Sequence, residues 1–152
     1  MTRPFQFRLE RVRALRERVE EQAREDLASS LAVRMKGEAM LRAAADDVDA
    51  AQDARRRTAT ADLSGAELLA LQAYLERTER QRESAALELD RRDAEVDARR
   101  QALTVRSQER QVLERLKDRR RADHKREMER REGALLDEMA LTLHRRSAEA
   151  AS

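Results

Sequence analysis

The chain has 152 residues, of which 42% are charged and 2% are aromatic, and it contains no cysteine, 3 glycines and 1 proline. This composition excludes a disulfide framework and an aromatic-rich compact core, and it is typical of long amphipathic helices. Acidic and basic residues nearly cancel, at a formal net charge of +2. Because the two signs alternate along the chain, ion-paired helix faces are favoured over a phosphate-binding tail.

A first helix is predicted over about 4–57. Pro4 suits the first turn of a helix, because its fixed φ is helical and its missing N–H would be unpaired there. Apolar residues then recur in steps of three and four, which keeps them on one helix face. They are Phe5, Leu9, Val12, Val19, Ala23, Leu27, Leu41, Ala45 and Val48.

The apolar pattern stops near the middle of the chain, where a turn is predicted over about 58–63. Ser64 and Glu67 then form a capping box, in which each side chain satisfies a backbone N–H of the first turn. A second helix is therefore predicted over about 65–146, with a tail at 147–152. Its apolar stripe is Leu68, Leu71, Leu75, Thr78, Ala85, Leu89, Val96, Leu103 and Leu113.

Two striped helices joined by a short turn predict an all-α fold, a long antiparallel two-helix coiled-coil hairpin with the second helix longer. We expect a single elongated unit over residues 1–152. Folding at the turn leaves the end of the second helix beyond the first, with a basic block over 115–131. A last apolar patch follows, and an isolated helix with such a face is expected to bind a partner. The patch is Leu135, Leu136, Met139 and Leu143.

No pattern in the sequence indicates catalysis, and neither a cofactor nor a metal is expected. His124 and His144 have no accompanying ligand pattern, and the glycines are too isolated to form a phosphate-binding loop. The apolar runs are too short for a signal peptide or a membrane span, so the chain is expected to be soluble.

The run Arg119-Arg120-Arg121 suggests nucleic acid as a possible partner. A solvated helix face is the favoured interpretation, because Asp118 and Asp123 flank the run and no aromatic residues are interleaved for base stacking. No nucleic-acid partner is expected. A basic coiled coil that binds nucleic acid stays the alternative from a different functional class.

Several segments together resemble the FliJ family of flagellar export proteins. The opening of the chain, 5–12 followed by 15–17, is similar to the start of that family, and 71–75 resembles its segment after the hairpin turn. Segments 113–120 and 136–140 are similar to its closing blocks. In this order and spacing the resemblance covers nearly the whole chain.

The resemblance implies a non-enzymatic component of the flagellar type III export apparatus, similar to the central stalk of rotary ATPases. The implied partners are the flagellar export ATPase, the export gate membrane protein and substrate chaperones, which the protein would help to recycle. The implied location is cytoplasmic, peripheral to the inner face of the cell membrane at the flagellar base, with membrane contact only through partners. The equivalent stalk protein of a non-flagellar type III secretion system is the close alternative.

Two binding sites follow from the resemblance and from the apolar residues at the ends of the hairpin. Near the turn, export-gate binding is expected of Leu71, Tyr74 and Leu75. The open end is expected to enter the export ATPase ring, as the terminal helices of a rotary stalk do. The residues expected there are Phe5, Phe7, Leu9 and Val12, with Leu135, Leu136 and Met139 from the second helix.

Overall fold

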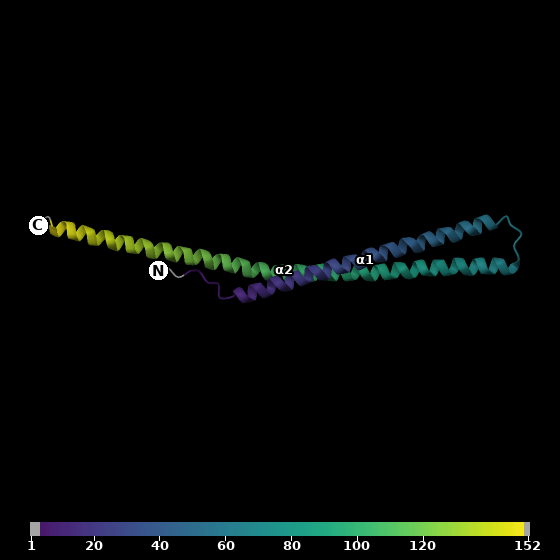
Figure 1. Cartoon of the computed structure of the whole chain (residues 1–152), viewed down its shortest axis with the longest axis horizontal. Coiled ribbons are helices and arrows are strands. Elements are labelled where there is room, and N and C mark those ends of the chain that lie inside the picture. The colour runs from purple at the N-terminus through teal and green to yellow at the C-terminus, as the bar shows by residue number, and fades with distance from the viewer. Residues whose placement is uncertain (1–3, 151–152) are drawn as a thin grey trace. The chain divides into compact units, whose positions relative to one another are not determined.

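The computed structural model describes residues 4–150, in which a non-helical segment at 4–9 precedes two α-helices joined by residues 59–64 (Figure 1). Helix α1 spans Glu10–Thr58 and helix α2 spans Gly65–Ala150, with 49 and 86 residues. No strand occurs in the described range. The predicted all-α hairpin with a longer second helix is confirmed.

The start of α2 follows the predicted capping box. The backbone N–H of Ser64 donates to a carboxylate oxygen of Glu67 at 2.8 Å, and the N–H of Glu67 donates to the Ser64 hydroxyl at 3.3 Å. These two bonds satisfy donors that the first turn of a helix leaves unpaired. As predicted, α2 begins at Gly65.

The start of α1 differs from the prediction, because the helix begins at Glu10 and not near residue 4. The N–H of Glu10 donates to the Phe7 carbonyl at 3.1 Å, a turn that separates the helix from the extended residues before it. Outside the helix, the Phe5 ring reaches His124 of α2, with ring centroids 5.8 Å apart. Pro4 therefore does not occupy a first helical turn.

The end of α2 also differs from the prediction, since the helix continues to Ala150 and most of the predicted tail is helical. Residues 147–150 contain no glycine or proline and include two alanines, the residue with the highest helix propensity. The last two positions of the predicted tail lie outside the described residues.

The chain divides into two compact units, which are described separately. The turn unit comprises Val19–Arg106, and the terminal unit comprises the residues up to Arg18 together with those from Ser107 onward. The expectation of one elongated unit stays a prediction.

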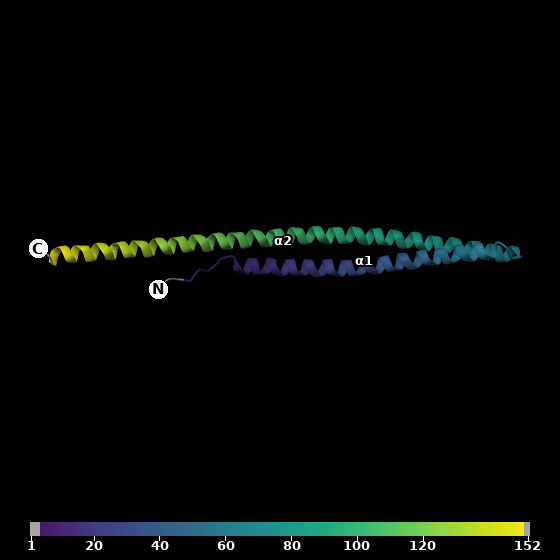
Figure 2. The ribbon, with the colours of Figure 1, turned by 90° about the horizontal axis from the view of Figure 1, so that it is seen from above.

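In the turn unit, α1 and α2 pack antiparallel along a narrow core (Figures 1 and 2). Its buried apolar side chains are at most 6% exposed, and they are Val48, Ala51, Leu75 and Val96. Thr78 is also buried and donates its hydroxyl proton to the Leu75 carbonyl at 2.8 Å. Four of these five residues belong to the predicted stripes, and Ala51 does not.

Charged side chains supplement this core. Arg34 of α1 pairs with Asp93 of α2, and Arg99 of α2 lies 3.6 Å from Asp26 of α1. Glu20 is buried beside the seam and accepts a hydrogen bond from Arg24 at 2.7 Å. The turn unit therefore combines a thin apolar seam with ion pairs between the helices.

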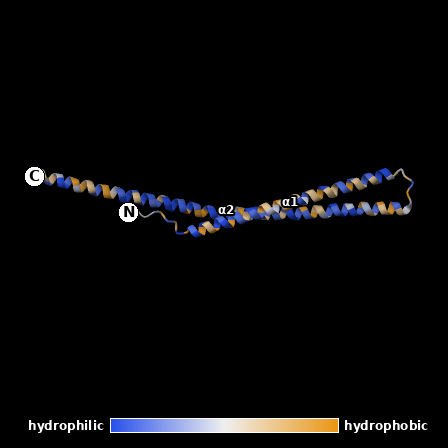
Figure 3. Ribbon diagram, viewed as in Figure 1, coloured by the Kyte–Doolittle hydropathy of each residue, from blue (hydrophilic) through white to orange (hydrophobic). Residues whose placement is uncertain are grey.

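In the terminal unit, ion pairs connect the first turns of α1 to α2, and no described residue is fully buried. Glu10 pairs with Lys117 at 2.9 Å, and Arg13 pairs with Glu114 at 2.8 Å. Further along α2, the Phe5 ring contacts His124, and every residue from 131 to 150 is exposed. Apolar positions nevertheless recur along this stretch, seen as orange bands in Figure 3.

Neither helix, within the described range, contains a stretch that is both apolar and long enough to cross a membrane.

Candidate partner-binding surfaces

The N-terminal aromatic residues lie against α2 of the terminal unit. Phe5 and Phe7 are half-buried, and the guanidinium carbon of Arg121 lies 5.8 Å from the centroid of the Phe5 ring. With the tilted contact between Phe5 and His124, this arrangement holds one ring between a cation and an imidazole. The sequence did not predict the roles of Arg121 and His124, because they depend on a contact between distant parts of the chain.

A groove runs between this extended segment and α2. Its floor and rim mix apolar groups with charges of both signs, so it suits an amphipathic segment of a partner. The lining residues are Phe5, Gln6, Phe7, Arg8, Leu9, Leu116, Arg120, Asp123, His124 and Glu127.

Leu9 and Val12 remain accessible at the start of α1, with 40% and 41% of their surface exposed. They are the two members of the predicted ATPase-binding set that lie nearest the cross-helix ion pairs. Because α1 begins at Glu10, only Val12 of the four N-terminal members lies within the helix.

The C-terminal members of the same set lie further along α2. Leu135, Leu136 and Met139 are 60–66% exposed. The groove lining ends at Glu127, eight residues or about 12 Å before Leu135. The predicted set thus forms two patches of one unit and not a single surface.

The basic block over 115–131 overlaps the groove lining at Arg120, Asp123 and Glu127, and most of its charged side chains are exposed. Arg126 pairs with Asp123 at 3.7 Å, and Arg131 pairs with Glu127 at 3.0 Å, all with exposed side chains. Exposed pairs of this kind contribute only about 0–1 kcal/mol each. The predicted interpretation as an ion-paired, solvated helix face fits these contacts.

Near the turn, the three predicted gate-binding residues have different environments. Leu75 belongs to the core, Leu71 is half-buried, and Tyr74 is 39% exposed with the Arg77 guanidinium 5.5 Å from its ring centroid. Leu68 and Leu69 are more exposed than any of these three. Tyr74 is therefore the accessible aromatic group of this surface, whereas Leu75 is buried in the core.

A shallow groove borders that surface in the turn unit. It is lined by Arg55, Thr58, Ala59, Leu68, Leu71 and Gln72. Because both Leu68 and Leu71 line it, the groove extends the apolar surface near Tyr74 toward the end of α1.

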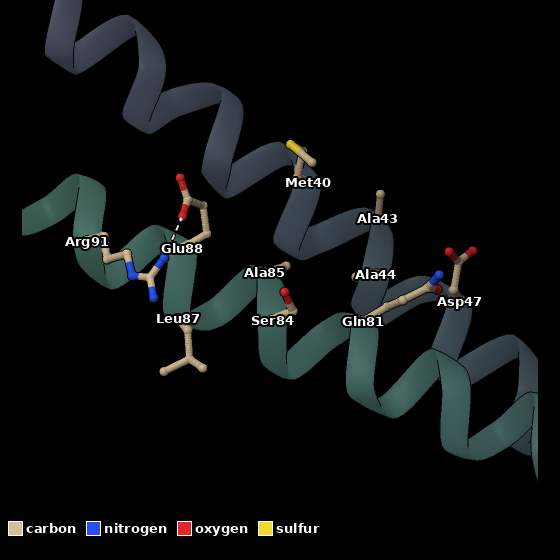
Figure 4. Close-up of a pocket in the computed structure, with 10 residues that line it drawn as sticks. All are labelled: Met40, Ala43, Ala44, Asp47, Gln81, Ser84, Ala85, Leu87, Glu88 and Arg91. Atoms are coloured by element: carbon tan, nitrogen blue, oxygen red, sulfur yellow. Dashed lines mark ion pairs between the residues drawn. The ribbon is translucent and has the colours of Figure 1, made fainter.

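Sequence reasoning missed a further groove in the middle of the turn unit (Figure 4). Small side chains such as Ala44 and Ala85 leave space between the helices, and Met40 and Leu87 at its edges are more than 60% exposed. In Figure 4, Ala85 faces α1, whereas Leu87 points away from it. The run of alanines at 43–45 was the available signal, because small residues in a seam leave space.

No group of three or more histidine, aspartate or glutamate side chains in the described range is placed to hold a metal ion.

Comparison with known protein families gives a match over most of the chain. The family model described as the flagellar FliJ protein matches residues 5–149, which is nearly the whole chain. Neither the curated proteins nor the solved structures give a significant match.

Proposed function

The chain belongs to the FliJ family and is a component of the flagellar export apparatus, in which we propose that it acts as a non-enzymatic stalk or adaptor. In this role it binds the export ATPase ring and the export gate and helps to recycle substrate chaperones. It works in the cytoplasm at the flagellar base, and reaches the membrane only through its partners. No nucleic-acid partner is proposed, because acidic residues are interleaved with the basic block over 115–131 and pair with its arginines.

One observation supports the ATPase contact above all others. In the terminal unit no described side chain is fully buried between the helices, and Leu135, Leu136 and Met139 of α2 are exposed. Burial of such side chains in a ring would contribute about 1.5–3 kcal/mol each. Rotary stalks place their terminal helices in the centre of a ring, and this end of the chain has the apolar surface for that position. The basic block beside it would add salt-sensitive attraction to acidic surfaces of the ring.

The test is a double substitution of Leu136→Ala and Met139→Ala in the full chain. Alanine preserves helix propensity and removes the apolar surface, so affinity for the cognate export ATPase should fall at least about tenfold. Stimulation of ATP hydrolysis should fall with it. Leu141→Ala is the matched control, because Leu141 is equally exposed but lies on the other side of α2.

The ATPase contact at this patch is wrong if the double variant binds and stimulates the enzyme as the wild type does. A loss shared equally by Leu141→Ala would show a general defect of the helix and would also contradict the assignment. Circular dichroism of each variant checks that helix content is unchanged.

The gate contact is proposed at Tyr74, with Leu71 beside it. Tyr74→Ala removes an accessible aromatic side chain that is not part of the core, so binding to the gate's cytoplasmic domain should weaken while thermal stability stays close to that of the wild type. Leu75→Ala should lower stability by about 2–5 kcal/mol, because it creates a cavity in the core. Equal loss of stability in both variants would show that Tyr74 only covers the seam.

A further inference from the structure

The exposed apolar face near the C-terminal end of α2 has one charged residue at each of its two ends. Glu132, Leu135, Met139, Leu143 and Arg146 define what we call the C-terminal stripe. At about 100° per residue, these five positions fall within an arc of about 80° on the helix. All five are exposed, and neither Glu132 nor Arg146 forms an ion pair within the described part of the chain.

The stripe is complementary to itself when reversed. Glu132 and Arg146 each lie seven residues from Met139, and Leu135 and Leu143 each lie four residues from it. Antiparallel pairing of two such helices about Met139 therefore places Glu132 opposite Arg146, Leu135 opposite Leu143, and Met139 opposite its counterpart. Parallel pairing would instead place like charges opposite each other at both ends of the stripe.

A second pair of charges supports the same arrangement. Arg131 and Glu149 lie on one edge of the stripe, eight and ten residues from Met139 on opposite sides. In antiparallel helix pairs the same edge of each helix faces the other, so Arg131 of one copy comes near Glu149 of the other. The two-fold symmetry of such a contact makes each of these pairs occur twice.

From this complementarity we propose that the C-terminal stripe binds a second copy of this chain, antiparallel and centred on Met139. The contact extends over 131–149, and it covers Leu135 and Met139. Bound in this way, the stripe is closed to any other partner, so this pairing competes with the proposed ATPase contact at Leu135 and Met139. The inference concerns the chain alone and does not rest on the proposed function.

Charge reversal at the two ends of the stripe gives a decisive test. In Glu132→Arg, two arginines face each other at both ends of the pair, and in Arg146→Glu two glutamates do. Each variant alone should dimerise about tenfold more weakly than the wild type, measured by sedimentation velocity over a range of concentrations. Mixed in equal amounts, the two variants should form a heterodimer, since every facing pair is then of opposite charge.

Arg130→Glu is the matched control, because it makes the same charge change on the opposite side of α2 and should dimerise as the wild type does. A fluorescent label at the C-terminus of each single variant should give energy transfer only in the mixture. The proposal is overturned if the wild type stays monomeric at several hundred micromolar. It is equally overturned if the mixed variants associate no better than either alone.

Discussion

Glu10 is held by basic side chains from both helices, which makes it the most perturbed acid among those with a resolved shift. Hydrogen bonds from Arg13 and Lys117 stabilise its carboxylate and lower its pKa from the ordinary 4.5 to about 2. A carboxyl group with a depressed pKa in the folded state contributes stability that is fully present above its unfolded pKa. That contribution is lost as pH falls from about 4.5 toward 2.

We therefore predict a carboxyl titration of Glu10 near pH 2, observable by NMR of the side-chain carbonyl. Arg13→Met should raise this pKa toward 4.5 by more than Lys117→Met does, because the bond from Arg13 has the larger effect. Lys125→Met serves as the control, since Lys125 pairs with Glu129 and not with Glu10. A wild-type titration near 4.5 would show that the ion pairs do not hold the carboxylate in solution.

At the scale of helices, the two glycines within helix interiors should respond differently to substitution. A Cβ added at Gly37 meets Leu89 at 3.6 Å, an ordinary contact in the turn unit, and one added at Gly133 meets nothing within 4 Å. Neither has a positive φ, so alanine fits both and gains about 0.5–1 kcal/mol of helix stability. Gly37→Ala should therefore raise the thermal midpoint of the chain. Gly133→Ala should increase amide protection near residue 133 with little change in that midpoint. A higher thermal midpoint for Gly133→Ala than for Gly37→Ala would contradict this expectation.

The turn of the hairpin could be predicted from the sequence because several local signals coincide there. The apolar pattern stops, and Ser64 and Glu67 have the spacing of a capping box, whose geometry needs no distant residue. Val48, Leu75 and Val96 were also expected in the seam, because helical spacing alone places them on one face.

The start of α1 and the polar side chains in the seam could not be predicted in this way. The extended segment that contains Phe5 is stabilised by His124 and Arg121, which lie far from it in the sequence. Glu20 is buried although apolar periodicity gives no reason to place a carboxylate there, and the pairing with Arg24 accompanies its burial. Similarly, local pattern could not show that Leu75 lies in the core while Tyr74 is accessible. The binding roles of the candidate residues stay predictions.

For the whole molecule, the two units differ in what holds their helices together. The turn unit has a buried apolar seam, whereas the terminal unit has ion pairs and no fully buried side chain among its described residues. Screening weakens exposed and partly exposed ion pairs, while apolar burial is insensitive to moderate salt or strengthened by it. Raising the ionic strength should therefore weaken helix pairing in the terminal unit more than in the turn unit.

Hydrogen exchange measured at about 0.05 and about 0.5 M sodium chloride tests this difference. Between these concentrations the Debye length falls from roughly 14 to roughly 4 Å. Amides of residues 13–18 should exchange faster at the higher concentration, because Arg13 and Arg16 lose attraction to Glu114 and Glu109. Amides around Val48 and Ala51 should keep their protection. The variant Lys117→Met should show the faster exchange already at low salt, because it removes one of the cross-helix ion pairs. Uniform loss of protection in both units would contradict this difference, because it would mean that the two units open together.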